Sequence, residues 1–341
     1  MPDQSQTIAR PLIDNEWRRW IVENLTLGNP PQGVLQAMVE AGFEPQQAGQ
    51  EVQTALNSPY FAGTQRMRNR LAKRDWVLDN MRRLNQMRSP EVPRLLRPSA
   101  EQFLDQFYSA GRPLIITGAL DHWPAMKKWN FDYFINGWGE REVEVQFGRN
   151  GNARYEVDKS RHQRMMPFGE YTQMVRDGGR TNDYYMTAAN NSHNDKALQE
   201  MWADIGPIPE YLDGQRAERG FLWFGPAGTI TPFHHDLTNN FMAQIIGRKR
   251  VLIVPPWEIA GMYNDEHCFS QVDGRNIDYE RFPAMRNVRV LECELRPGEL
   301  LFLPAGCWHF VEGLDVSATI TFINFHWDNS FYTSYPGQLA Y

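Results

Sequence analysis

The sequence of 341 residues contains only three cysteines, too few for a disulfide framework. Cys268, Cys293 and Cys307 cannot all pair with one another and none stands in a CxxC motif, so we expect reduced thiols. Long apolar runs are absent as well, since no stretch approaches the ~20 residues that a membrane-spanning helix needs. The first ten residues are polar and lack the apolar core of a signal peptide. Together these absences predict a cytoplasmic protein that does not cross a membrane.

Positive charge is not in overall excess either. The formal net charge of −6 and the pI near 5.8 argue against a protein that is basic throughout, as many nucleic-acid-binding proteins are. Positive charge is nevertheless concentrated in residues 59–98, where ten Lys or Arg stand against three Asp or Glu, a local net charge of +7 (10 − 3). We interpret this basic segment as a solvated helix face. The alternative is a surface that binds an acidic peptide or a nucleic acid.

The N-terminal part of the chain is predicted to be helical. Between residues 12 and 57, apolar side chains recur with helical spacing in three short segments that are bounded by Gly or Pro. Helices this short need a partner to pack on. A proline-rich stretch that ends at Pro98 then marks a boundary. We therefore predict a helical N-terminal region at 1–98 and a second domain at 99–341.

The second domain is predicted to be mainly β. Its short apolar segments are separated by Gly and Pro, and no helices alternate with them, which favours a β-sandwich or barrel over a parallel α/β sheet. The segments with strand character are Pro113–Thr117, Glu142–Phe147, Tyr184–Thr187, Phe221–Phe224, Phe241–Ile246, Arg250–Val254, Val288–Leu295, Leu300–Leu303, His309–Glu312 and Ala318–Phe325.

Two short motifs in this domain offer metal ligands. The first is the sequence Thr-Pro-Phe-His-His-Asp, which ends in His234, His235 and Asp236. In an extended segment residues i and i+2 share a face, so His234 and Asp236 point the same way and His235 points away from them. The second motif ends in Pro-Ala-Gly-Cys-Trp-His, where a tight turn brings His309 back toward the same site.

Two histidines and one carboxylate form the ligand set that holds ferrous iron on one face and leaves positions open for chemistry. We therefore predict that His234, Asp236 and His309 bind the metal and make up the catalytic centre. The alternative is that His234 caps a turn and that His309 is a buried structural histidine. The stretch from Gly298 to His309 also matches the second cupin motif. The sequence departs from that motif four residues later, at Gly313, where many cupins have Asn.

Iron that activates O2 at such a site needs two electrons from a cosubstrate, and 2-oxoglutarate is the usual source. Its far carboxylate requires a cation and a hydroxyl, for which Lys249 and Thr231 are the candidates. Arg248 and Arg250 are alternative cations that should face the other side of the strand. The spacing leaves open whether Lys249 lines a pocket or lies in an exposed basic turn. Amide side chains that could add hydrogen bonds are those of Asn240 and Asn324.

The order of these motifs resembles a known family. Thr231–Pro256, Gly298–His309 and Thr319–Phe325 resemble the JmjC-type, cupin-like 2-oxoglutarate oxygenases, and among them the factor-inhibiting-HIF asparaginyl hydroxylases. The resemblance extends over roughly residues 99–330. It implies a double-stranded β-helix, a cupin or jelly-roll fold with helical additions, and Fe(II) bound by the three predicted ligands.

The resemblance also implies roles for the residues of the cosubstrate pocket. Lys249 and Thr231 would hold the far carboxylate of 2-oxoglutarate, and Asn240 and Asn324 would hold the cosubstrate near the metal. Tyr185 is similar to the tyrosine that closes the same pocket in the family. The chain departs from the family pattern at His326, where a tryptophan is expected, and in its helical N-terminal region. Homodimer formation and the substrate stay open for this reason.

The implied reaction is hydroxylation of an amino-acid side chain in a protein or peptide, with 2-oxoglutarate and O2 consumed and succinate and CO2 released. We hypothesise that the N-terminal helices and the basic segment dock this substrate. Hydroxylation of a free amino acid, a small metabolite or RNA is an alternative. A further alternative is a cupin binding module or isomerase with a redox-inert metal, because zinc or nickel binds the same ligands.

Overall fold

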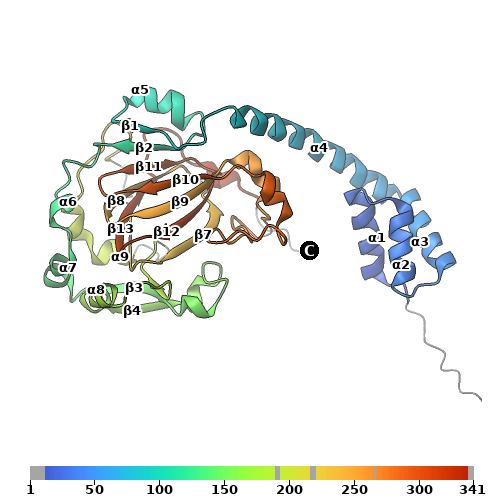
Figure 1. Cartoon of the computed structure of the whole chain (residues 1–341), viewed down its shortest axis with the longest axis horizontal. Coiled ribbons are helices and arrows are strands. Elements are labelled where there is room, and N and C mark those ends of the chain that lie inside the picture. The colour runs from blue at the N-terminus through green and yellow to red at the C-terminus, as the bar shows by residue number, and fades with distance from the viewer. Residues whose placement is uncertain (1–11, 189–192, 216–219, 265, 337–341) are drawn as a thin grey trace, which may run out of the picture. The chain divides into compact units, whose positions relative to one another are not determined.

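The computed structural model describes residues 12–188, 193–215, 220–264 and 266–336 (Figure 1). The chain divides into two compact units, Met1–Arg83 and Leu84–Tyr341, whereas the predicted boundary lies further along the chain, at 98/99. The ten N-terminal residues, in which we predict no signal peptide, lie outside the described residues. Within the described ranges, no helix combines the length and the apolar character needed to cross a membrane.

The first unit begins with three short helices, as the sequence predicts: α1 (Asn15–Leu27), α2 (Pro31–Glu40) and α3 (Pro45–Asn57). The Asp14 side chain caps α1 by accepting a hydrogen bond from the Trp17 amide. Gly28 ends the helix at φ 100°, a left-handed conformation that glycine adopts without a steric penalty. The apolar faces of the three helices form one cluster around Ile21 and Met38, which are fully buried. This mutual packing stabilises helices that would be marginal alone.

A single helix, α4 (Pro59–Gln86), contains most of the basic segment and runs across the boundary between the two units. None of its residues is buried, and Trp76 is 68% exposed. Arg82 and Arg83 both pair with Asp79, about one helical turn earlier. The exposure of this helix agrees with the interpretation of the segment as a solvated helix face.

Two facing sheets form the centre of the second unit (Figure 1). The larger sheet contains, in spatial order, β1 (Arg94–Leu96), β2 (Leu114–Thr117), β11 (Leu300–Leu303), β8 (Asn240–Ile246), β13 (Ser317–Phe322) and β6 (Phe221–Gly225). The smaller sheet contains β10 (Leu291–Leu295), β9 (Lys249–Val254), β12 (Trp308–Gly313) and β7 (Ile230–His235). Nearly all neighbours are antiparallel, and the mainly β fold confirms the predicted jelly-roll class with helical additions.

The central strands β11, β12 and β13 are buried on both faces, which explains why they appear as nearly continuous apolar runs. On β12, Trp308 and Phe310 face an outer cluster, whereas Val311 faces the cluster between the sheets. On β11, Leu301 faces that same inner cluster, and Phe302 packs outward against the helices. The alternation follows the two-residue period of a strand, so each strand sends every second side chain toward the space between the sheets.

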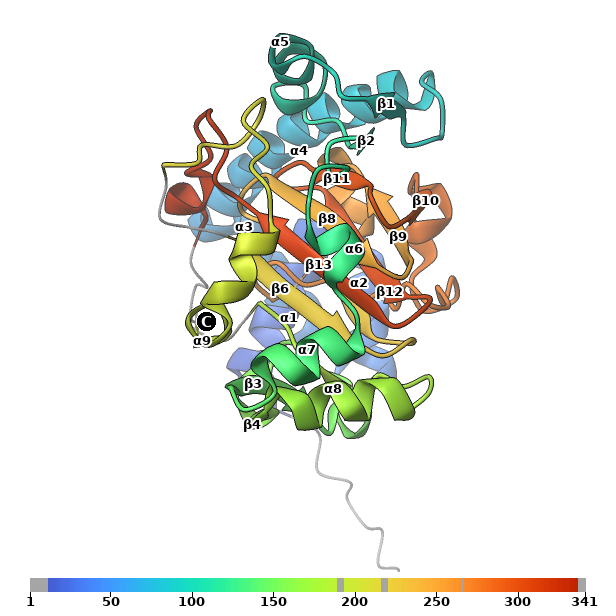
Figure 2. The same cartoon turned by 90° about the vertical axis from the view of Figure 1, so that its left-hand side faces the viewer.

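A third, smaller sheet joins β4 (Gln163–Pro167), β3 (Glu142–Phe147) and β5 (Tyr184–Tyr185). Figure 2 shows α7 (Phe131–Trp138) and α8 (Phe168–Asp177) side by side at this end of the unit. The remaining short helices are α5 (Ala100–Phe103), α6 (Ala125–Lys128) and α9 (His193–Ala197). Together these elements cover the outer face of the larger sheet and bury its aromatic residues.

Two strands differ from their predicted bounds by three residues at one end. The predicted strand Val288–Leu295 begins only at Leu291, and Ala318–Phe325 ends at Phe322. Strand β4 was not predicted, because the residues of this strand are mostly polar or exposed and do not alternate between apolar and polar. Nor was β1 predicted, which pairs in parallel with β2 and therefore lies with the second unit.

Candidate metal centre

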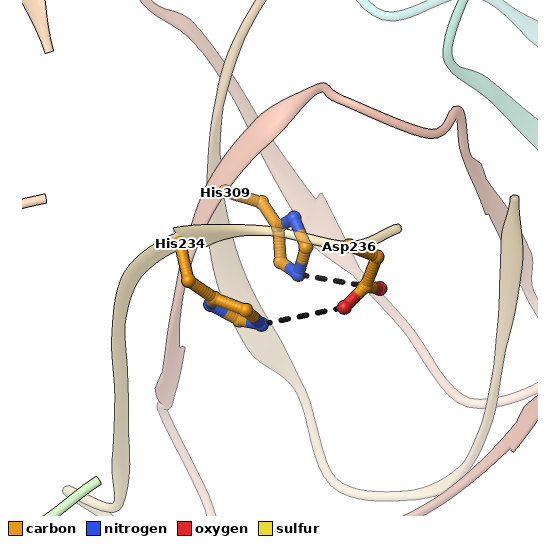
Figure 3. Close-up of side chains that lie close together, drawn as sticks. All are labelled: His234, Asp236 and His309. Atoms are coloured by element: carbon orange, nitrogen blue, oxygen red, sulfur yellow. Dashed lines mark ion pairs between the residues drawn. The ribbon is translucent and has the colours of Figure 1, made fainter. Parts of the chain in front are cut away.

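His234, Asp236 and His309 lie close together, as Figure 3 shows. His234 is on β7, Asp236 follows the end of that strand, and His309 is opposite His234 on β12. One ligand atom from each residue lies within 4.8 Å of the others, and among the described residues no second group of this kind occurs. His234 Nε2 is 3.6 Å from Asp236 Oδ1, and His309 Nε2 is 3.9 Å from Asp236 Oδ2. The geometry therefore gathers the three predicted ligands around one point.

A β-bulge sets the direction of the side chains on β7. His309 pairs with His234 and Val311 pairs with Thr231, so two steps along β12 correspond to three along β7. The extra residue lies beside Pro232, which cannot donate a ladder hydrogen bond and is tolerated at a bulge. Because of this insertion, Thr231 and His234 both face the inside of the barrel, while Phe233 is buried in the outer cluster.

A backbone carbonyl oxygen lies beside Nδ1 of each histidine ring, which leaves Nε2 available to bind a metal. His234 Nδ1 lies 2.9 Å from the carbonyl oxygen of Pro232, and His309 Nδ1 lies 3.1 Å from that of Cys307. A carbonyl only accepts, so each Nδ1 carries the proton and each Nε2 presents a lone pair. Both lone pairs lie beside Asp236, which is the arrangement a divalent metal requires.

The charge state of the three groups also suits a cation. Burial lowers the pKa of His309 to about 4, with the neighbouring His234 adding to the effect, so His309 is neutral at physiological pH. Burial lowers the pKa of His234 too, but the adjacent Asp236 carboxylate outweighs it and the net shift is upward. For Asp236, burial raises the pKa, yet His234, His309 and a hydrogen bond from Asn240 hold it well below its usual range. The site thus contains a fixed carboxylate and a neutral His309, and a bound cation would take the place of a proton on His234.

A cavity of about 100 Å³ opens beside these residues. Four of the five residues predicted to bind the cosubstrate line it: Tyr185, Thr231, Asn240 and Lys249. Lys249 is 2% exposed, and its Nζ donates a hydrogen bond to the Tyr185 hydroxyl at 3.1 Å. Asn240 Nδ2 donates to Asp236 Oδ2 at 3.1 Å, and its buried Oδ1 has no partner among the described residues.

Lys249 is a buried cation without a carboxylate partner among the described residues. Burial lowers its pKa to about 7 from 10.5, because nothing near it compensates the charge. Its neighbours on the strand differ: Arg248 pairs with Asp315 and Arg250 pairs with Glu292, both near the surface. The spacing left open whether Lys249 lines a pocket or lies in an exposed basic turn. Lys249 is buried and lines the cavity, so it is not part of an exposed turn. An anionic group of a ligand would satisfy it.

Asn324, the fifth predicted residue, is placed elsewhere. It follows the end of β13 and lines a separate cavity of about 570 Å³, while its Nδ2 donates to the Asp213 carbonyl at 2.9 Å. The strand that should have carried it to the metal ends at Phe322, so the two-residue alternation no longer applies at this position. Thr321, three residues earlier and still on β13, lines the candidate cavity in its place.

Four further residues, which were not predicted from the sequence, shape this cavity. They are Trp223, Met242, Val311 and Thr321. Trp223 Nε1 donates to the Thr321 hydroxyl at 3.1 Å, which fixes both side chains. Two of these residues were within reach of a sequence argument, because Met242 and Val311 stand two positions after Asn240 and His309 on their strands.

Arg149 is a further residue without a sequence signal. It is fully buried behind Tyr185, with its Cζ 5.2 Å from the Tyr185 ring centroid and 4.2 Å from that of Tyr155. Its Nη2 donates to Glu156 and to the Ile230 carbonyl, both at 2.7 Å. Arg149 therefore supports the wall that carries Tyr185, from a segment far away in the sequence.

Comparison with known proteins agrees with the architecture of this unit. Residues 99–333 match the model of a cupin-like domain. The chain is 35% identical over 240 residues to lysine-specific demethylase 8 of Xenopus tropicalis, and 33% identical over 231 residues to lysine-specific demethylase JMJ30 of Arabidopsis thaliana. These alignments cover 68% and 66% of this chain and 52% of each relative, so the chain spans about half the length of these two proteins.

A more distant similarity is 24% identity over 234 residues to tRNA wybutosine-synthesizing protein 5 of Gallus gallus, covering 65% of this chain and 73% of that protein. The narrower resemblance to the asparaginyl hydroxylases stays a prediction. The matched domain occupies most of the second unit and contains the whole candidate site. The chain belongs to the cupin-like, JmjC-type family of 2-oxoglutarate- and Fe(II)-dependent oxygenases.

Proposed function

We propose that this chain is an Fe(II)- and 2-oxoglutarate-dependent oxygenase that hydroxylates an amino-acid side chain in a protein or peptide. The observation that carries the proposal is the pairing, in one small cavity, of a two-histidine, one-carboxylate cluster with the buried, uncompensated Lys249. The cluster suits a divalent metal, and the lysine suits the carboxylate of an anionic cosubstrate. A redox-inert binding module would not require a buried cation beside its metal.

Different residues of the cavity would bind the metal and the cosubstrate. His234, Asp236 and His309 would hold the iron, and Asn240 would keep the Asp236 carboxylate in place through its hydrogen bond. Lys249 would bind the far carboxylate of 2-oxoglutarate together with Thr231, and Tyr185 would orient the lysine. When bound, iron and 2-oxoglutarate supply the oxidation: 2-oxoglutarate, O2 and a C–H group yield succinate, CO2 and a C–OH group. The apolar wall would exclude water from the cavity.

Two kinds of product would follow from the same oxidation. Hydroxylation of a side chain adds one oxygen atom, whereas hydroxylation of an N-methyl group releases formaldehyde and removes a methylene unit overall. Two relatives bear the name lysine-specific demethylase, and that name favours methylated lysine as the second candidate substrate. Mass spectrometry of unmodified and methyl-lysine peptides, incubated with the chain, Fe(II) and 2-oxoglutarate, separates the two by the sign of the mass change.

The matched control in this screen is the same chain with His309→Ala, which should leave every peptide unchanged. A gain of one oxygen on an unmodified peptide supports the proposal. Product on methylated peptides alone would replace hydroxylation by demethylation. Modification of tRNA in a parallel incubation, with every peptide unchanged, would move the substrate to RNA.

Removing the hydroxyl of Tyr185 should weaken the cosubstrate site without destroying it. Tyr185→Phe takes away the hydrogen-bond partner of Lys249 Nζ. A hydrogen bond of this kind contributes about 0.5–1.5 kcal/mol, so the KM for 2-oxoglutarate should rise by roughly 2–12-fold with kcat nearly unchanged. Tyr184→Phe, a change in the adjacent residue of β5, is the matched control and should leave this KM alone. An equal fall in kcat for both variants would contradict the assigned role.

The affinity for 2-oxoglutarate should decline on the alkaline side of neutrality. The pKa of Lys249 is about 7 in the empty cavity, so the lysine loses its proton as the pH rises above that value. Binding of a carboxylate then requires the uptake of a proton, and the apparent affinity should fall by up to about tenfold per pH unit above neutrality. The measurement is the KM for 2-oxoglutarate between about pH 6.5 and 9, a range that runs from just below this pKa to well above it.

Lys249→Arg provides the control for this pH profile. A guanidinium stays charged throughout this range, so the variant should lose the alkaline decline even where its overall affinity is lower. An unchanged decline in the variant would show that another group titrates. Thermal unfolding of both proteins at each pH checks that the longer side chain is accommodated.

A further inference from the structure

A second cavity in the same unit has a strongly cationic lining. It has a volume of about 210 Å³ and shares no lining residue with the candidate metal centre. Arg88, Arg112 and Arg289 line it, against Glu91 as its one acidic lining residue among those described. The formal charge of the lining is therefore +2 (3 − 1). This cavity has no role in the proposed reaction.

These arginines differ from most others in the unit because none of them pairs with a carboxylate. The guanidinium groups of Arg88 and Arg112 have no ion pair or hydrogen bond with any residue that the structure describes, while Arg289 donates only to the backbone carbonyls of Asn85 and Arg88. The arginines elsewhere with a carboxylate partner include Arg94, Arg97, Arg141, Arg248, Arg250, Arg286 and Arg296. The cavity thus leaves two guanidinium groups unpaired.

The two unpaired guanidinium groups are also close enough to repel each other. Burial lowers the pKa of Arg112, and the positive charge of Arg88 lowers it further. Arg112 is held in position, since its Cζ lies 5.4 Å from the centroid of the Phe107 ring. Like charges held together without a counter-ion are costly, and a bound anion removes that cost.

The lining also contains apolar side chains and a free donor. Leu291 is buried there, and Trp257 contributes an indole whose Nε1 is buried without a partner among the described residues. A buried N–H without an acceptor is uncommon in folded proteins. An occupant of this cavity would therefore meet both cationic donors and an aromatic and aliphatic surface.

We propose that this cavity binds a small organic anion. Its phosphate or carboxylate group lies between Arg88 and Arg112, and its apolar body lies against Trp257 and Leu291. Guanidinium forks match both kinds of head group in a bidentate manner, so the lining fixes the class of ligand by charge and shape together.

Calorimetric titration with phenyl phosphate, benzoate and inorganic phosphate tests this proposal. The titrations use the metal-free full chain with Lys249→Met, so that anion binding beside the metal centre is strongly weakened. We expect phenyl phosphate or benzoate to bind, more tightly than inorganic phosphate and less tightly as salt is added. The tighter of the two organic anions identifies the head group. Failure of both to bind, or binding no tighter than that of inorganic phosphate, overturns the proposal.

Arginine variants then locate the bound anion. Arg88→Gln together with Arg112→Gln should weaken binding at least about tenfold, because each removes a charge-assisted hydrogen bond. Arg88→Gln alone changes an exposed side chain, so it cannot fail through misfolding, and should weaken binding several-fold. Arg164→Gln, at an exposed arginine on β4, is the matched control and should bind as before. Equal affinity in the double variant and this control contradicts the assignment.

Discussion

Asp236→Ala is expected to abolish Fe(II)-dependent turnover of 2-oxoglutarate. The change removes the one carboxylate of the cluster and leaves the two histidines 4.2 Å apart, by ring centroids, with no negative charge between them. Loss of an outer contact to a metal ligand already costs about 10–100-fold in affinity, so loss of the ligand itself should cost more than ~100-fold. The measurement is succinate formation at increasing Fe(II), together with direct titration of the metal.

Two further variants test whether the effect comes from loss of the metal-binding carboxylate. Asp315→Ala removes an exposed carboxylate that pairs with Arg248, and this matched control should keep both metal affinity and turnover. Asp236→Asn preserves size but loses the charge, so it should resemble the alanine variant in iron affinity. Turnover that survives in Asp236→Ala at ordinary Fe(II) would contradict the assignment of the metal centre.

Lys249→Met should raise the 2-oxoglutarate concentration required for half-maximal turnover by about 30–5,000-fold, since truncating one member of a buried charge pair costs roughly 2–5 kcal/mol. The methionine fills a similar volume and leaves the metal ligands untouched. Iron affinity without cosubstrate should therefore be unchanged, which distinguishes this variant from Asp236→Ala. Arg250→Met removes a neighbouring cation that faces Glu292 and is the matched control.

The same substitution should make the empty protein more stable. The pKa of Lys249 falls from 10.5 in the unfolded chain to about 7 in the folded one, so charging this lysine opposes folding. The penalty is complete below pH 7, on the order of 3–5 kcal/mol, and disappears as the pH rises toward 10.5, because the unfolded state binds the extra proton in that interval. Chemical denaturation at pH 6.5 and at pH 9.5 (about 3 pH units apart) should show a gain in Lys249→Met that shrinks at the higher pH. An equal gain at both would contradict the assigned pKa.

The ligand set could be predicted from the sequence because it depends on local rules. His234 and Asp236 are two residues apart in an extended segment, and His309 follows a turn that returns the chain to the same place. Thr231 does not follow from this rule, since three residues separate it from His234. It reaches the cavity through the bulge beside Pro232, and a proline within a strand was the available signal for such a bulge.

Other parts of the site depend on contacts that no local pattern contains. The position of Asn324 required knowledge of where β13 ends, and strand ends are set by pairing with neighbours rather than by the strand's own residues. Arg149 supports Tyr185 from a turn after β3, and nothing in its own segment indicates the contact. The fold class could be predicted from the sequence. Short apolar segments separated by Gly and Pro, with no helices alternating between them, restrict the architecture to a few choices.

The most direct test of the account is absorption spectroscopy of the purified chain under anaerobic conditions. Addition of Fe(II) and 2-oxoglutarate together should produce a visible charge-transfer band, which neither component produces alone. The band should be absent in Asp236→Ala and should need far more 2-oxoglutarate in Lys249→Met. Admission of O2 should then yield succinate and CO2. The absence of both the band and succinate in the unaltered chain would contradict the proposal that this site is that of a 2-oxoglutarate oxygenase.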